Sequence, residues 1–167
     1  SPWVKLMEEM LRAVLRAREE LNLPHEIVVK EHPVDVGRYD YGDLEKAAGV
    51  TWLWDYPLDQ AMEGAECVVT VNSSVGIEAV VRGLPLVTLG NAIYNVEGVA
   101  HHARSEEELP SRLKAALEEP LNTPFRHEFL CTLRFREMVD ASWGKPTDTG
   151  VENTLERLRA HFGRQGQ

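Results

Sequence analysis

The sequence predicts an α/β fold with a Rossmann-like parallel sheet and flanking helices. Short apolar runs of strand length alternate along the chain with segments whose apolar residues recur at helical spacing. The clearest run is Val68-Val69-Thr70-Val71, which stops at Asn72-Ser73-Ser74 and leads directly into an amphipathic pattern. Four strands that alternate with helices in this way are typical of a doubly wound parallel sheet.

Each predicted element has a local signal. Apolar positions at helical spacing open the chain, and Asn22-Leu23-Pro24 ends that helix. Gly64 and Gly83 each stop a later helix. Ser105 and the acidic residues after it are predicted as the N-cap and first turn of another helix. The predicted helices are 4–21, 44–48, 58–64, 74–82, 105–119, 125–140 and 151–162, the strands are 27–29, 50–54, 67–71 and 85–89, and the loops are 34–43 and 90–103.

A length of 167 residues predicts one domain. Within it we expect a leading helix over 1–21, an α/β core over 26–104 that carries the motifs, and a helical portion over 105–167. The chain begins Ser1-Pro2-Trp3, without an initiator Met or a signal peptide. This beginning suggests a processed chain or a piece of a longer protein.

Charge and cysteine content exclude several classes of protein. The formal net charge is −9 and no run rich in Lys or Arg occurs, which argues against a nucleic-acid partner. The longest apolar runs have only the length of a strand, so no segment is expected to span a membrane. Cys67 and Cys131 lie in apolar patterns without metal-ligand spacing and are predicted as core thiols, which fits a cytoplasmic protein.

The run that ends at Asn72-Ser73-Ser74 predicts an anion site. The first turn of the helix that follows has unpaired N–H groups and a partial positive charge, and the two serines add hydroxyls. The strand at 27–29 leads to Lys30, His32 and Pro33. In an open parallel sheet both strand ends face one crevice, so we expect a ligand that bears phosphate. The glycine-rich signatures of nicotinamide-cofactor and ATP-binding loops are absent.

Three stretches in this order resemble the nucleotide-binding half of capsule polysaccharide synthesis proteins. They are Lys30-Glu31-His32-Pro33, then Asn72-Ser73-Ser74-Val75-Gly76-Ile77-Glu78-Ala79, then the run from Arg82 to Tyr94. That family contains retaining β-Kdo transferases with a GT-B fold and CMP-Kdo as donor. The resemblance covers roughly 27–101 and implies the C-terminal, donor-binding half of such a glycosyltransferase. Bacterial sialyltransferases and CDP-glycerol glycerophosphotransferases share the His-Pro and Ser/Thr features, so a CMP-sialic acid or CDP-glycerol donor is an alternative.

The resemblance assigns roles that the residues alone leave open. His32 would donate a hydrogen bond to the phosphate and stabilise the leaving group, or it could pack against Pro33. The base of the nucleotide would be recognised near His32 and Pro33. Ser73 and Ser74 would bind phosphate or cap the helix. Glu78 would accept the ribose hydroxyls or remain a solvated carboxylate. Lys30 would neutralise an anion or stay solvated. Gly76 would let a ligand approach the backbone, or it could pack within the helix. The other predicted ligand-binding residues are Asn72 and, at the pocket border, Tyr94 with Asn95.

No metal or cofactor is expected, because His101-His102 lacks a further ligand at suitable spacing and the donor has a single phosphate. The resemblance places the catalytic acidic residue and the site for a saccharide or glycolipid acceptor in a missing N-terminal half. Any contact with the inner membrane would also belong to the missing part. The chain would therefore be half of an enzyme and inactive alone. A non-catalytic module that binds a cytidine nucleotide is the alternative from another class.

Overall fold

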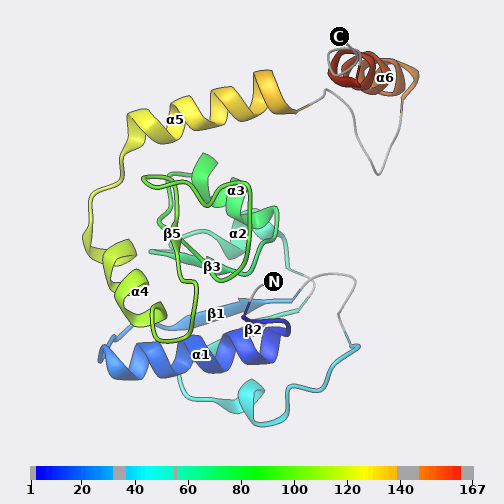
Figure 1. Ribbon diagram of the computed structural model, residues 1–167. Coiled ribbons are helices and arrows are strands. Elements are labelled where there is room, and N and C mark those ends of the chain that lie inside the picture. Colours follow the sequence, from blue (N-terminus) through cyan, green and yellow to red (C-terminus); the bar gives the residue numbers. More distant parts are fainter. Residues whose placement is uncertain (1–2, 32–36, 55, 139–146, 163–167) are drawn as a thin grey trace. The chain divides into compact units, whose positions relative to one another are not determined.

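Every strand pairing in the described residues is parallel, as the sequence predicts. The computed structural model describes residues 3–31, 37–54, 56–138 and 147–162 (Figure 1). The elements are α1 (Met7–Glu20), β1 (Ile27–Lys30), the 3-10 helix η1 (Gly42–Lys46), β2 (Val50–Leu53), α2 (Leu58–Ala61), β3 (Val68–Thr70), α3 (Val75–Val81), β4 (Leu86–Thr88), β5 (His101–His102), α4 (Leu109–Glu118), α5 (Thr123–Thr132), the π-helical turn η2 (Leu133–Glu137) and α6 (Asp148–Phe162).

The strands form two small sheets, β1-β2 and β3-β4-β5, in place of the single predicted sheet. In the first sheet Ile27 pairs with Val50 and Lys30 with Leu53. In the second, β4 is central, with Val87 paired to Val69 on one side and to His101 on the other. Ile27 of β1 packs against the same apolar core as Val69. The two sheets are therefore joined by side-chain packing, whereas the prediction of a single sheet implies backbone hydrogen bonds between them.

The strand β5 lies inside the predicted loop over 90–103. Two histidines carry neither β-branched side chains nor an alternating pattern, so no local signal marks them as a strand. Their extended conformation comes from pairing with β4, where Thr88 pairs with His102 and the Thr88 carbonyl accepts the Ala103 N–H at 2.9 Å. A tertiary contact thus creates this strand.

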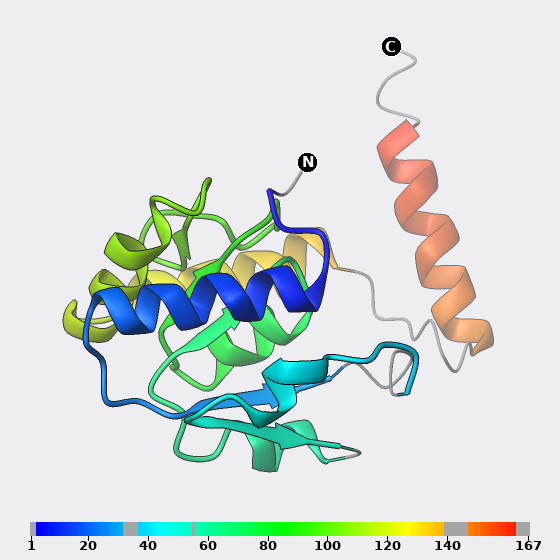
Figure 2. The same ribbon diagram turned by 90° about the horizontal axis from the view of Figure 1, so that it is seen from below.

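The first helix closes both apolar cores. Its start is held by Glu9, whose Oε2 accepts the N–H groups of Lys5 and Leu6 at 2.8 and 3.2 Å, and these bonds lower the pKa of Glu9. Leu11 packs against the β1-β2 sheet with Val29, whereas Val14 belongs to the larger core around β4. Figure 2 shows α1, in dark blue, running lengthwise across the view. The amphipathic pattern of the leading segment is therefore confirmed, over Met7–Glu20.

The helix predicted over 105–119 begins later than expected. It starts at Leu109 with Glu108 as N-cap and Pro110 in its first turn, which suits a residue without an N–H. Ser105 precedes a turn and does not cap the helix. The Glu108 carboxylate accepts the Arg104 N–H at 2.9 Å and closes that turn.

The chain divides into two compact units, residues 1–125 and 126–167. The two apolar cores described above lie in the first unit. The second unit contains the rest of α5, η2 and α6. In the part of the chain that the structure describes, no helix is long and apolar enough to cross a membrane.

Candidate functional site

The turn over 72–74 connects the buried strand β3 to α3. The Ser73 hydroxyl accepts the Val75 N–H at 3.3 Å, and the Ser73 carbonyl accepts the Gly76 N–H at 3.0 Å. The Ser74 side chain makes no capping bond to α3, and Asn72 and Ser74 are exposed. The two serines therefore differ, because Ser73 shapes the backbone and Ser74 presents its hydroxyl to solvent.

Tyr94 supports this turn from inside the protein. Its side chain is 2% exposed, and its hydroxyl donates to the Ser73 carbonyl at 2.5 Å. Burial raises the pKa of Tyr94 to about 12. The neighbouring Asn95 accepts from the Thr88 hydroxyl at 2.8 Å and donates to the Gly90 carbonyl at 2.8 Å. The loop after β4 is thus fastened at Asn95 and holds Tyr94 beneath the Ser73 turn. The place of both residues at the border of a donor pocket, which the resemblance implies, stays a prediction.

Gly76 provides the space that Tyr94 occupies. A Cβ at Gly76 would lie 2.6 Å from Cε2 and 2.7 Å from the hydroxyl oxygen of Tyr94. Only a residue without a side chain fits there in the present packing. The structure thereby gives Gly76 a packing role, one of its two readings from sequence, and a ligand contact by its backbone stays a prediction.

Glu78 points its carboxylate toward the C-terminal end of its own helix. Its Oε1 lies 2.9 Å from Nε of Arg82, in an i,i+4 ion pair with both side chains partly exposed. Such exposed pairs are worth at most about 1 kcal/mol, so Glu78 can exchange this partner for a ligand hydroxyl at little cost. Contact with a ribose remains a prediction.

The carboxyl end of β1 carries a buried carboxylate that sequence reasoning missed. Glu31 is 2% exposed, and its Oε1 accepts the Tyr41 hydroxyl at 2.8 Å. Its Oε2 is buried without a hydrogen bond among the described residues. The available signal was its position, two residues after the buried Val29 and hence on the same face of β1.

The other residues predicted at this end divide into two groups. Lys30 is half-buried and donates to the carbonyl of Glu31 at 3.5 Å, with no bond to the Ser73 turn among the described contacts. His32 and Pro33 lie outside the described residues. The structure therefore brings Ser73, Gly76 and Tyr94 into contact with one another. Lys30 lies at the end of a different strand, β1. Asn72, Ser74 and Glu78 belong to the same turn and helix as Ser73 and Gly76.

The remaining titratable candidates lie away from this turn. Burial, together with Arg104 and Arg112, lowers the pKa of His102. Among the described residues, no three His, Cys, Asp or Glu side chains are grouped so as to hold a metal ion. Burial raises the pKa of Cys67 to about 12, as fits a core thiol. Cys131 is half-buried, with its sulfur 3.9 Å from Nε2 of His127.

Fold and site define a parallel α/β domain with a hydroxyl-bearing turn between a buried strand and a helix. Residues 4–131 match the family described as capsule polysaccharide biosynthesis protein. The chain belongs to this family. No solved structure matches it.

Similar proteins include three bacterial relatives. The capsule polysaccharide export protein KpsS of Escherichia coli is 32% identical over 83 residues, 45% of this chain and 21% of that protein. Protein FixF of Sinorhizobium fredii is 31% identical over 159 residues, 93% of this chain and 38% of FixF. The capsule polysaccharide modification protein LipB of Neisseria meningitidis serogroup A is 29% identical over 82 residues, 44% of this chain and 20% of LipB. The chain spans well under half the length of each relative.

Proposed function

We propose that this chain is the donor-binding part of a cytoplasmic glycosyltransferase that transfers Kdo from CMP-Kdo during capsular polysaccharide synthesis. Membership of the capsule polysaccharide biosynthesis family supports the pathway. The observation that carries the donor site is the turn over 72–74. There the exposed Ser74 hydroxyl lies directly before α3, and Tyr94 holds the backbone of Ser73 in place.

The chemistry required of such a site is modest. A leaving CMP carries charge on one phosphate, and preorganised donors at that position stabilise it as the glycosidic bond breaks. The first N–H groups of α3 are bonded to Ser73 and to the Ser74 carbonyl, so the Ser74 hydroxyl would supply the donor on one side, and His32 would supply one from the end of β1. Glu78 would accept ribose hydroxyls, since a carboxylate next to phosphate would repel it. Acceptor and catalytic acid would come from another part of a longer protein, so the chain alone would bind the donor without transferring sugar.

The first test is nucleotide selectivity of the 167-residue chain by isothermal titration calorimetry. CMP and CDP should bind more tightly than UMP, AMP or GMP. Ser74→Ala should weaken CMP by about tenfold to a hundredfold, the loss of one hydrogen bond to a charged group. Tighter binding of UMP than of CMP would contradict the cytidine assignment.

The same titrations separate the roles of the residues. His32→Ala should weaken CMP much more than cytidine, whereas Glu78→Ala should weaken both ligands equally. Arg82→Ala is the matched control for Glu78, because it removes the same ion pair and leaves the carboxylate in place. If Arg82→Ala reproduces the loss of Glu78→Ala, Glu78 acts through the helix and makes no ribose contact.

A further inference from the structure

Four aromatic rings form a continuous row on the β1-β2 side of the first unit. The ring centroids of Tyr39 and Tyr41 are 6.4 Å apart, those of Tyr41 and Trp52 4.6 Å, and those of Trp52 and Trp54 5.2 Å. The two indoles are stacked, with 12° between their planes. We call Tyr39, Tyr41, Trp52 and Trp54 the aromatic ladder.

The strand register sets the direction of the aromatic ladder. Trp52 pairs with Val29 across the β1-β2 sheet. Because side chains alternate along a strand, Trp54 returns to the face of Trp52, directly after β2 ends at Leu53. The ladder therefore leads from the buried side of the sheet toward the carboxyl ends of β1 and β2. In open parallel sheets, ligands bind outside these ends.

Hydrogen bonds hold the middle of the ladder, and its ends are open. The buried Glu31 accepts the Tyr41 hydroxyl at 2.8 Å, and the Trp52 indole N–H donates to the Leu44 carbonyl at 3.4 Å. Tyr39 is 53% exposed and Trp54 is 44% exposed. Tyr41 and Trp52 are thus fixed, and Trp54 is ordered by stacking on Trp52, so a ligand that stacks on Trp54 would cost little additional side-chain entropy.

We infer that the aromatic ladder is a stacking surface for the pyranose rings of a saccharide, at the carboxyl edge of the β1-β2 sheet. The face of an aromatic ring is electron-rich and attracts the polarised C–H groups that a pyranose presents on its flat side. Membership of a capsule polysaccharide biosynthesis family puts sugar chains among the molecules that such a surface would meet. This inference requires the family and does not require that the nucleotide is cytidine.

Two other occupants fit the ladder less well. With Tyr41 buried, two exposed rings make a surface far smaller than the roughly 800 Å² per partner of a stable protein interface. The planes of Tyr39 and Tyr41 are tilted by 50° and those of Tyr41 and Trp52 by 34°, so the row gives a flat nucleobase no single platform. A saccharide needs only the exposed faces.

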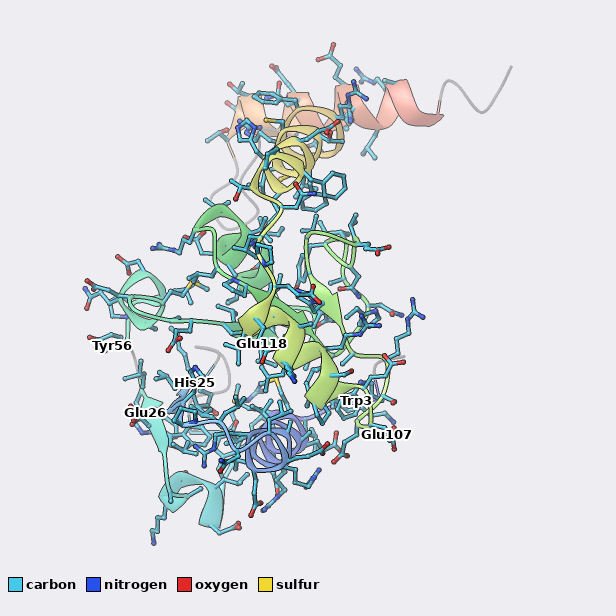
Figure 3. The ribbon with its side chains drawn as sticks, turned by 90° about the vertical axis from the view of Figure 1, so that its left-hand side faces the viewer. Trp3, His25, Glu26, Tyr56, Glu107 and Glu118 are labelled. Atoms are coloured by element: carbon cyan, nitrogen blue, oxygen red, sulfur yellow. The ribbon has the colours of Figure 1, made fainter. Side chains whose placement is uncertain are left out.

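The test is a titration of the ¹⁵N-labelled 167-residue chain with cellohexaose, with a hexamer of galacturonic acid, and with CMP, observed through the indole N–H cross-peaks. At least one oligosaccharide should shift the Trp52 and Trp54 peaks and leave Trp3 unchanged. Figure 3 shows Trp3 on the opposite side of the view from Tyr56, which lies two residues after Trp54 in the sequence. The Trp3 indole N–H is bonded to the Ala103 carbonyl at 3.0 Å. Trp54→Ala should reduce the affinity by about fivefold to tenfold, and Tyr39→Ala should reduce it as well.

Phe135→Ala is the matched control, since Phe135 is an exposed aromatic residue in the other unit, and it should change nothing. Ladder shifts with CMP alone would overturn the inference in favour of a nucleobase platform. Shifts that depend on protein concentration would replace it by contact between copies of the chain. The inference would be refuted if neither oligosaccharide shifted the Trp52 and Trp54 peaks of the wild type, or if Trp54→Ala and Phe135→Ala reduced the affinity equally. Neither result would bear on CMP binding.

Discussion

Tyr94 links two segments that the sequence treats separately. It belongs to the loop after β4, yet its hydroxyl bonds to the Ser73 carbonyl and its ring lies against Gly76 of α3. The motif residues around the turn are therefore coupled physically. Their geometry depends on a buried side chain that need not touch any ligand.

Gly76→Ala should destabilise the protein by about 1–3 kcal/mol, because the new methyl group has no room beside the Tyr94 ring. Elsewhere in a helix the same change would be favourable by roughly 1 kcal/mol. Urea unfolding of the wild type, Gly76→Ala, Tyr94→Leu and the double variant measures the effect. The double variant should lose less than the sum of the single variants, and strict additivity would show that the two residues do not contact each other.

Stability should fall on the alkaline side through Tyr94 and Cys67. Burial raises both pKa values to about 12, from 10.0 for the phenol and 9.0 for the thiol. The folded state therefore keeps these protons when the unfolded state has lost them, so the stabilisation is complete below about pH 9 and disappears as the pH rises toward 12. Melting temperatures measured from pH 8 to 11 should decline less steeply in the Cys67→Ala, Tyr94→Phe double variant. A slope identical to that of the wild type would contradict this assignment.

Among the elements, β4 is the one on which the second sheet depends. All three of its residues are buried, and it pairs with β3 and with β5. Leu89, directly after it, is fully buried and its N–H donates to the Thr70 carbonyl at 3.0 Å. The strand also precedes the loop that delivers Tyr94 to the Ser73 turn, so packing at β4 and geometry at the site are connected.

Leu89→Ala should cost about 2–5 kcal/mol in unfolding free energy, because it opens a cavity in the main core. Val81→Ala is the control on the neighbouring helix α3, where Val81 is 60% exposed and the change should stay within about 0.5 kcal/mol. Guanidinium unfolding followed by circular dichroism measures both. Equal effects of the two changes would contradict the close packing of Leu89 in the core around β4.

At the scale of the whole molecule, the first unit contains what an independent domain needs. The two apolar cores described above, the five strands of the described residues and the Ser73 turn lie within residues 1–125. The family match extends a few residues further, to 131. The second unit adds helical segments, and most of the side chains described in α6 are exposed.

A protein truncated after Phe125 should therefore fold cooperatively and retain the melting temperature of the full chain within a few degrees. Differential scanning calorimetry of both proteins makes the comparison. CMP titration of the truncated protein is a second readout, because the proposed donor turn lies within it. Loss of the cooperative transition would show that residues 126–167 complete the core.

The sequence by itself determined the local elements. Apolar periodicity, glycine stops and the abrupt change at Asn72-Ser73-Ser74 predict β1, β2, β3 and β4, the leading helix and the strand–turn–helix unit, because each of these signals acts over a few neighbouring residues. The order of the motifs also predicted the capsule polysaccharide family, which the comparison with known families confirms.

Only the tertiary structure decided the contacts between distant segments. It made a strand of His101 and His102, divided the strands into two sheets, placed Tyr94 under Gly76, and joined Glu31 to an aromatic row that runs from the segment before η1 to β2. These features depend on which buried surfaces meet, and packing of that kind is a property of the whole core that no short stretch of sequence specifies.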